Sequence, residues 1–109
     1  MSQNINNLIN DKNKILNYLQ ELKSRFNFIE DIYITGSRVW EFGERKRGEY
    51  NYRKKPHENS DWDLIIKTKF ACKPFTNLCQ EEGYYIEAAC IHDSEFLENI
   101  KNRKTLIKI

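Results

Sequence analysis

Three short runs of β-branched and aromatic residues set the strongest limit on how this chain folds, because each has the length of a single strand. They cover residues 32–35, 61–67 and 84–91. Stretches with helical periodicity lie between and around them, at residues 11–26, at residues 74–82 and after Ser94. Strands that alternate with helices predict a small α/β or α+β fold, with one mixed sheet and the helices packed on one side of it.

The expected helices have recognisable ends. Asp11 is an N-cap residue type ahead of the first helix, and Ser94 has the same character ahead of the last. Pro74 begins the middle helix and Gly83 ends it. Residues 105–109 fit either a short final strand or a frayed tail.

Chain length and composition limit the class of protein. The 109 residues allow one domain, which we place at residues 1–109. Aromatic residues make up 13% of the chain and charged residues 31%, which favours a folded core over disorder. No apolar stretch approaches the roughly 18 residues of a membrane span, and the first residues do not resemble a secretory signal, so we expect no membrane partner.

Net charge and cysteine content limit the class of protein further. The net charge of +2 is too small to indicate a nucleic-acid-binding protein by itself. The three cysteines show no metal-binding spacing. They favour reduced thiols over a disulfide framework, and hence a cytoplasmic location.

Two carboxylates mark the start of the second strand. Asp61 and Asp63 are two residues apart, so their side chains share one face of an extended strand. Neighbouring like charges are unfavourable until a divalent cation binds them, and Mg²⁺ commonly takes one or two carboxylates together with substrate phosphates. The alternative is a pair of solvated charges at a strand end.

A tight turn follows the first strand. Gly36 permits the turn and close approach of a ligand, and Ser37 offers a hydroxyl and an N–H at the start of a helical turn, where phosphate is favoured. The alternative is a simple turn with an N-cap serine. The two signals reinforce each other because they occur in a fixed order: strand, Gly-Ser, short helix, and a strand that bears Asp-x-Asp.

This order resembles the nucleotidyltransferase superfamily typified by DNA polymerase β, over residues 32–91. The resemblance implies Mg²⁺-dependent transfer of a nucleoside monophosphate from a nucleoside triphosphate to a hydroxyl of a protein, an RNA or DNA end, or a small molecule. Asp61, Asp63 and Glu87 would hold two Mg²⁺ ions, for which Mn²⁺ is an expected substitute. Gly36 and Ser37 would bind the triphosphate. Arg38 would either reach the phosphates or pair with Glu41 at the surface.

The chain departs from the family pattern in two ways. Glu87 stands where an Asp is commoner, and Asp93 is the fallback third ligand. In addition, residues 43–60 form a long basic insertion, which we expect to be a flap. Its candidate contacts to nucleic acid or acceptor are Arg45, Lys46, Arg47, Tyr50, Tyr52, Arg53, Lys54 and Lys55. The alternative is a solvated loop.

Two other functions stay open. One is a catalytically inactive module that binds nucleotide or nucleic acid, which Glu87 and the long insertion favour. The other is an antitoxin-type interaction protein of a toxin–antitoxin pair. Since the chain is little more than a catalytic core, the acceptor would be recognised by the flap, by a second copy in a homodimer, or by a partner protein.

Overall fold

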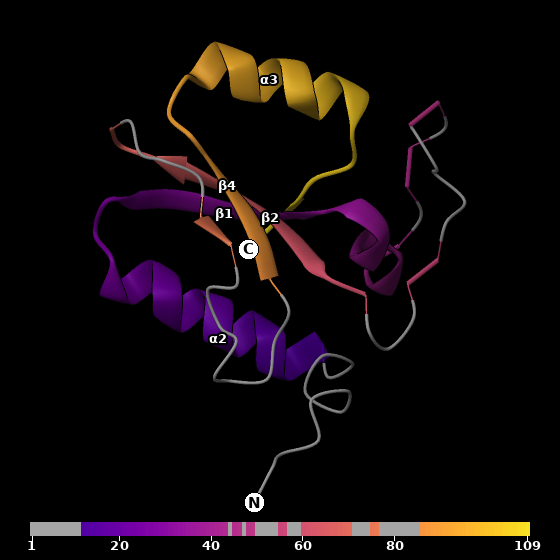
Figure 1. The fold of residues 1–109 in the computed structure, drawn as a ribbon, viewed down its shortest axis with the longest axis horizontal. Coiled ribbons are helices and arrows are strands. Elements are labelled where there is room, and N and C mark those ends of the chain that lie inside the picture. Colours follow the sequence, from indigo (N-terminus) through magenta and orange to yellow (C-terminus); the bar gives the residue numbers. More distant parts are fainter. Residues whose placement is uncertain are drawn as a thin grey trace, which may run out of the picture.

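Apart from a short strand within the segment 74–82, the elements of the fold follow the order expected from the sequence (Figure 1). The computed structural model describes residues 12–43, 45–46, 48–49, 55–56, 60–70, 75–76 and 86–109. Its helices are α2 (Lys12–Arg25), the 3₁₀ helix η1 (Gly36–Glu41) and α3 (Ser94–Arg103). Its strands are β1 (Ile29–Thr35), β2 (Trp62–Thr68), β3 (Phe75–Thr76), β4 (Ile86–Ile91) and β5 (Ile107–Lys108).

The five strands form one mixed sheet in the order β3-β4-β2-β1-β5. Strands β2 and β4 pair in parallel, and every other neighbouring pair is antiparallel. This arrangement confirms the predicted small α/β class. Among the described residues, we find no helix with the length and apolar character of a membrane span.

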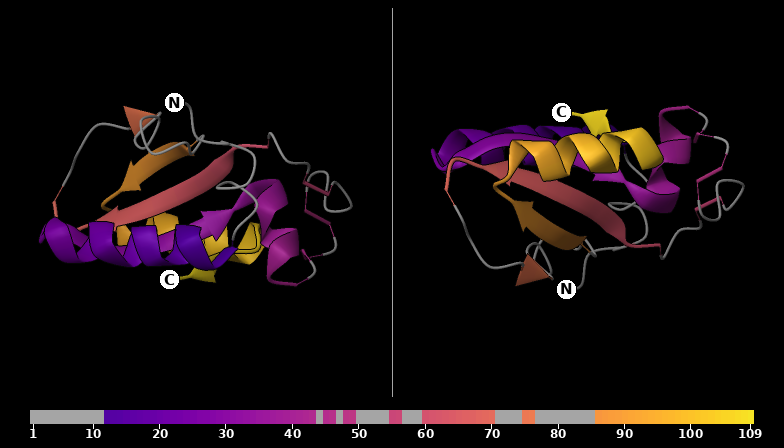
Figure 2. Two further views of the ribbon diagram at one scale, coloured as in Figure 1. Left: turned by 90° about the horizontal axis from the view of Figure 1, so that it is seen from below. Right: turned by 90° about the horizontal axis from the view of Figure 1, so that it is seen from above.

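The helices cover both faces of the sheet, so the expectation that they pack on one side is wrong (Figures 1 and 2). The reason lies in the strands, whose apolar residues occupy both alternating positions. Ile32, Ile34, Leu64 and Ile66 face α2, whereas Tyr33, Ile65 and Ile91 face α3. A sheet with two apolar faces needs a cover on each.

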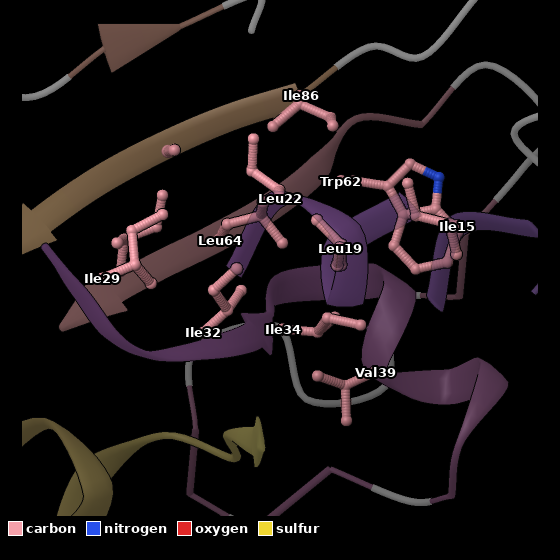
Figure 3. Close-up of a cluster of buried hydrophobic side chains, with 12 residues drawn as sticks. Ile15, Leu19, Leu22, Ile29, Ile32, Ile34, Val39, Trp62, Leu64 and Ile86 are labelled. Atoms are coloured by element: carbon pink, nitrogen blue, oxygen red, sulfur yellow. The ribbon is translucent and has the colours of Figure 1, made fainter. Parts of the chain in front are cut away.

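The larger core lies between α2 and the sheet (Figure 3). Ile15, Leu19 and Leu22 are spaced along one side of α2 and are buried. Trp62, the first residue of β2, is fully buried among them. The Trp62 side chain therefore fixes which face of β2 packs against α2, and Asp63 must point to the face that α3 covers.

Two local predictions differ from the structure. Phe75 and Thr76 form strand β3 rather than part of a helix, and the rest of the predicted helix at 74–82 lies outside the described residues. The expected N-cap Asp11 lies outside them too. The N-cap of α3 is Asp93 rather than Ser94, because Asp93 Oδ1 accepts hydrogen bonds from the backbone N–H groups of Glu95 and Phe96.

Substitution of Asp93 by alanine is expected to lower the free energy of unfolding by about 1 kcal/mol, because two backbone N–H groups lose their acceptor. Ser94→Ala, which leaves both hydrogen bonds in place, is the matched control and should cost less than about 0.5 kcal/mol. Urea denaturation of the two variants beside the unaltered chain measures both values. Equal losses in the two variants would contradict the assignment of the cap.

Candidate functional site

Three polar side chains form a row across the central strands at one end of the sheet. Thr35 of β1 pairs with Asp63 of β2, and Asp63 pairs with Glu87 of β4. All three lie on the face that α3 covers, because they alternate with residues of the α2 core. Adjacent strands are about 5 Å apart, so the two carboxylates are direct neighbours in the row.

The turn after β1 is in contact with this row. Gly36 has a φ of 76°, a conformation that side chains with a Cβ rarely adopt. A Cβ at Gly36 would overlap Oδ2 of Asp63 and would lie 3.1 Å from its Cγ. Glycine is therefore required at position 36 for two reasons: the backbone has a positive φ, and the Asp63 carboxylate occupies the space of a side chain. The structure thus brings Gly36 and Asp63 together.

Thr35 is the residue that sequence reasoning missed. It is 7% exposed, and its Oγ1 has no hydrogen-bond partner among the described residues. A buried hydroxyl without a partner carries a desolvation cost that a ligand atom could remove. The sequence offers only a weak signal for this role, since a threonine at the end of a strand is ordinary.

A pocket of about 780 Å³ lies between this face of the sheet and α3. Its volume is typical of sites that hold a small molecule. Thr35, Gly36, Asp63 and Glu87 line one end. The row of polar groups is therefore the wall of a cavity rather than part of a flat surface.

Asp61 and Ser37 are not among the described residues that line the pocket. Asp61 precedes β2 and is exposed. Ser37 is half-buried in the first turn of η1. Among the described residues, no group of three or more His, Cys, Asp or Glu side chains is close enough to hold a metal ion. Asp63 and Glu87 are the predicted ligands that lie on the pocket wall.

Arg38 pairs with Glu41, as one of the two expectations had it, but the pair does not place Arg38 at the surface. It is 1% exposed, so it is neither at the surface nor open to a phosphate. Its Nε and Nη2 donate to the carbonyl oxygen of Ser60 at 3.1 and 2.7 Å, and its Nη1 donates to Glu41 at 2.9 Å. The guanidinium also lies 4.9 Å from the ring centroid of Trp62. Arg38 therefore ties η1 to the entry of β2, next to Asp63.

Asp93, the fallback ligand, is occupied as the N-cap of α3 and is not among the pocket residues that the structure describes. It precedes α3, whereas Glu87 lies in the row with Asp63. Of the two candidates for the third carboxylate, Glu87 is the one that the fold brings to the pocket.

Part of the predicted flap at 43–60 is anchored at the edge of the pocket. Glu49 is buried and accepts hydrogen bonds from the backbone N–H and the hydroxyl of Thr105, at 3.2 and 3.0 Å. It also pairs with Arg45 at 3.3 Å. The N–H of Lys46 donates to the Thr105 hydroxyl at 2.7 Å. This segment is therefore fixed to the chain just after α3.

Because of this anchoring, not all of the basic residues expected to contact nucleic acid lie at the surface. The Arg45 side chain is 7% exposed and lines the pocket, so it is not available to an extended phosphate backbone at the surface. Lys46 is exposed, and its ammonium donates to the carbonyl oxygen of Lys101. Lys55 is exposed, with its ammonium 5.7 Å from the ring centroid of Trp40. Arg47, Tyr50, Tyr52, Arg53 and Lys54 lie outside the described residues.

The end of α3 adds positive charge to the pocket. Arg103 and Lys104 line it together with Arg45. Nearby, a hydrogen bond to Glu98 raises the pKa of the Lys101 ammonium, Tyr33 adds to this effect, and desolvation opposes it. The pocket presents carboxylates on the sheet and cations on α3.

Comparison of the chain with family models, with curated proteins and with solved structures found no match. The described residues of the pocket define the chemistry of this site. They combine two carboxylates, a buried hydroxyl, a glycine in close contact with one carboxylate, and several cations. Such a mixture suits a ligand that carries both phosphate groups and a divalent cation.

Proposed function

We propose that this chain is a metal-dependent nucleotidyltransferase, which moves a nucleoside monophosphate from a nucleoside triphosphate to a hydroxyl acceptor. One observation carries the proposal: the Asp63 carboxylate lies against Gly36 and in register with Glu87, on the wall of a pocket of nucleotide size. Asp-x-Asp and Gly-Ser are separate in the sequence, and a shared function explains why they meet.

The donor atoms at this wall fit Mg²⁺. Asp63 and Glu87 supply two carboxylates from neighbouring strands, and their mutual repulsion favours a cation between them. Thr35 Oγ1 supplies a third oxygen, which lacks a hydrogen-bond partner in the described part of the chain. Mg²⁺ typically binds through one or two carboxylates and substrate phosphates, with water completing its shell. When bound, the ion stabilises negative charge on the phosphates and makes an acceptor hydroxyl easier to deprotonate.

The chain's own groups have separable roles in this proposal. Asp63 and Glu87 would hold the ion, and the missing side chain of Gly36 leaves room for the Asp63 carboxylate. The Ser37 hydroxyl, in the first turn of η1 next to Gly36, would donate a hydrogen bond to a phosphate oxygen. Arg103 and Lys104, on the α3 side of the pocket, would neutralise part of the triphosphate charge. Arg38 acts indirectly, because its hydrogen bonds to the carbonyl oxygen of Ser60 hold η1 against the segment that leads into β2.

The proposal is tested by incubating the chain with nucleoside triphosphates labelled at the α- or the γ-phosphate, in the presence of Mg²⁺ or Mn²⁺. RNA, a protein mixture and an aminoglycoside serve as acceptors, and self-labelling is recorded. Transfer of the α label with release of pyrophosphate supports the proposal. Transfer of the γ label would contradict it. Nucleotide binding without any transfer would instead support the catalytically inactive module.

A further inference from the structure

The side of α3 that faces the pocket is apolar at the beginning of the helix and basic at its end. Phe96, Ile100 and Arg103 are four and three residues apart, so they share one side of the helix, and all three line the cavity. Lys104 follows at the same end as Arg103. The helix therefore presents an aromatic ring at its beginning and two cations at its end, about 10 Å apart by the helical rise.

The direction of α3 places the cations near the carboxylates. Only His92 and Asp93 separate the end of β4 from α3, and α3 runs back over the sheet (Figure 2). Leu97 and Ile100 of α3 pack in one cluster with Tyr33, Ile65 and Ile91 of the sheet. After α3, Ile107 pairs with Ile34, next to Thr35. Arg103 and Lys104 thus lie toward the end of the sheet that bears Asp63 and Glu87, and Phe96 lies toward the opposite end.

Phe96 is not needed to attach α3 to the sheet. Leu97 and Ile100 make that contact and are buried, whereas Phe96 is 52% exposed. A large aromatic side chain that lines a pocket and keeps an exposed ring is suited to stacking on a planar ligand. The apolar residues Ile65, Ala89 and Ile91 line the pocket from the sheet.

We infer that Phe96 is the platform on which the nucleobase of the triphosphate substrate stacks, with the phosphates directed toward Arg103, Lys104 and the carboxylates. This inference rests on the proposed function and specifies how that site holds its substrate. Stacking uses the face of the base rather than its hydrogen-bonding edge, so purine and pyrimidine triphosphates should both bind. The pocket therefore accepts nucleoside triphosphates as a class.

The test is isothermal titration calorimetry with Mg²⁺ and two probes, α,β-methylene-ATP and inorganic tripolyphosphate. The unaltered chain is expected to bind the nucleotide about 5- to 150-fold more tightly than tripolyphosphate, the range typical of one stacked base. Phe96→Leu keeps an apolar side chain without a ring, and it should lose most of this advantage with unchanged affinity for tripolyphosphate. Phe96→Trp should retain it. Phe70→Ala, at an exposed phenylalanine outside the described pocket lining, is the control and should change neither affinity.

The possible results separate this inference from the proposed function. Equal affinity of the unaltered chain for both probes, or a full nucleotide advantage in Phe96→Leu, would overturn the role of Phe96 and leave the phosphate site intact. Binding of neither probe by the unaltered chain would overturn the proposed function and the inference with it. Loss of the advantage in Phe96→Leu together with its retention in Phe96→Trp would support the inference.

Discussion

Replacement of Asp63 by asparagine is expected to reduce nucleotidyl transfer by at least about 10³-fold, which corresponds to about 4 kcal/mol of transition-state stabilisation. Asparagine has nearly the same shape as aspartate, so the contact with Gly36 is kept and only the charge is lost. A neutral amide beside Glu87 leaves a single carboxylate in the row to hold Mg²⁺. The loss should therefore appear mainly in turnover, measured as pyrophosphate release under saturating nucleotide.

Two companion variants make the result interpretable. Glu30→Gln removes an exposed carboxylate at the end of β1 opposite the row with Asp63; Glu30 is not among the described residues that line the pocket, and its substitution should leave transfer unchanged. Asp61→Asn removes the predicted ligand that precedes β2 and is exposed. It should cost less than Asp63→Asn, because Asp63 is the member of the pair on the pocket wall. Full activity in a folded Asp63→Asn variant would contradict the proposed catalytic role.

Substitution of Gly36 by alanine is expected to reduce transfer by about 10²-fold and also to destabilise the fold. Two effects add. The positive φ costs about 1–2 kcal/mol for a residue with a Cβ. The new methyl group would also overlap Asp63 Oδ2, so the carboxylate must move, and a displacement of about 1 Å at a catalytic group is enough for a loss of this size.

Gly48→Ala separates these two effects. Gly48 has a φ of 85°, similar to that of Gly36, but a Cβ there would meet nothing within 4 Å in the described structure. Both variants should therefore lose stability from backbone strain, and Gly36→Ala should lose more because its methyl group also overlaps Asp63; urea denaturation measures both losses. Only Gly36→Ala should also lose transfer activity. Equal activity losses in the two variants would show that backbone strain, and not the displacement of Asp63, is responsible.

The strands and their inward faces could be predicted from local sequence. Alternation in residues 61–67 places Trp62 and Asp63 on opposite faces of one strand, and the structure has them so. The Gly-Ser turn also followed from its neighbours. The register between strands, however, depends on pairing between distant residues. The alignment of Thr35, Asp63 and Glu87 in one row became visible only with the sheet.

The remaining parts of the site depend on long-range contacts. Glu49 and Thr105 are 56 residues apart and form the anchor of the flap, which no local pattern indicates. Arg38 was expected at a phosphate or paired with Glu41 at the surface. The pair with Glu41 is present, but Arg38 is buried between the carbonyl oxygen of Ser60 and the Trp62 ring. The position of α3 over the Asp63 face was missed because a single apolar stripe on a helix does not specify which face it covers.

The central claim is that Asp63 and Glu87 hold one metal ion together with a nucleotide in the pocket beneath α3. A crystal structure of the chain with α,β-methylene-ATP and Mn²⁺ tests it most directly, since the anomalous signal of manganese locates the ion independently of the nucleotide. We expect an anomalous peak coordinated by both carboxylates and by phosphate oxygens. Nucleotide bound away from this pocket, or manganese that touches neither carboxylate, would contradict it.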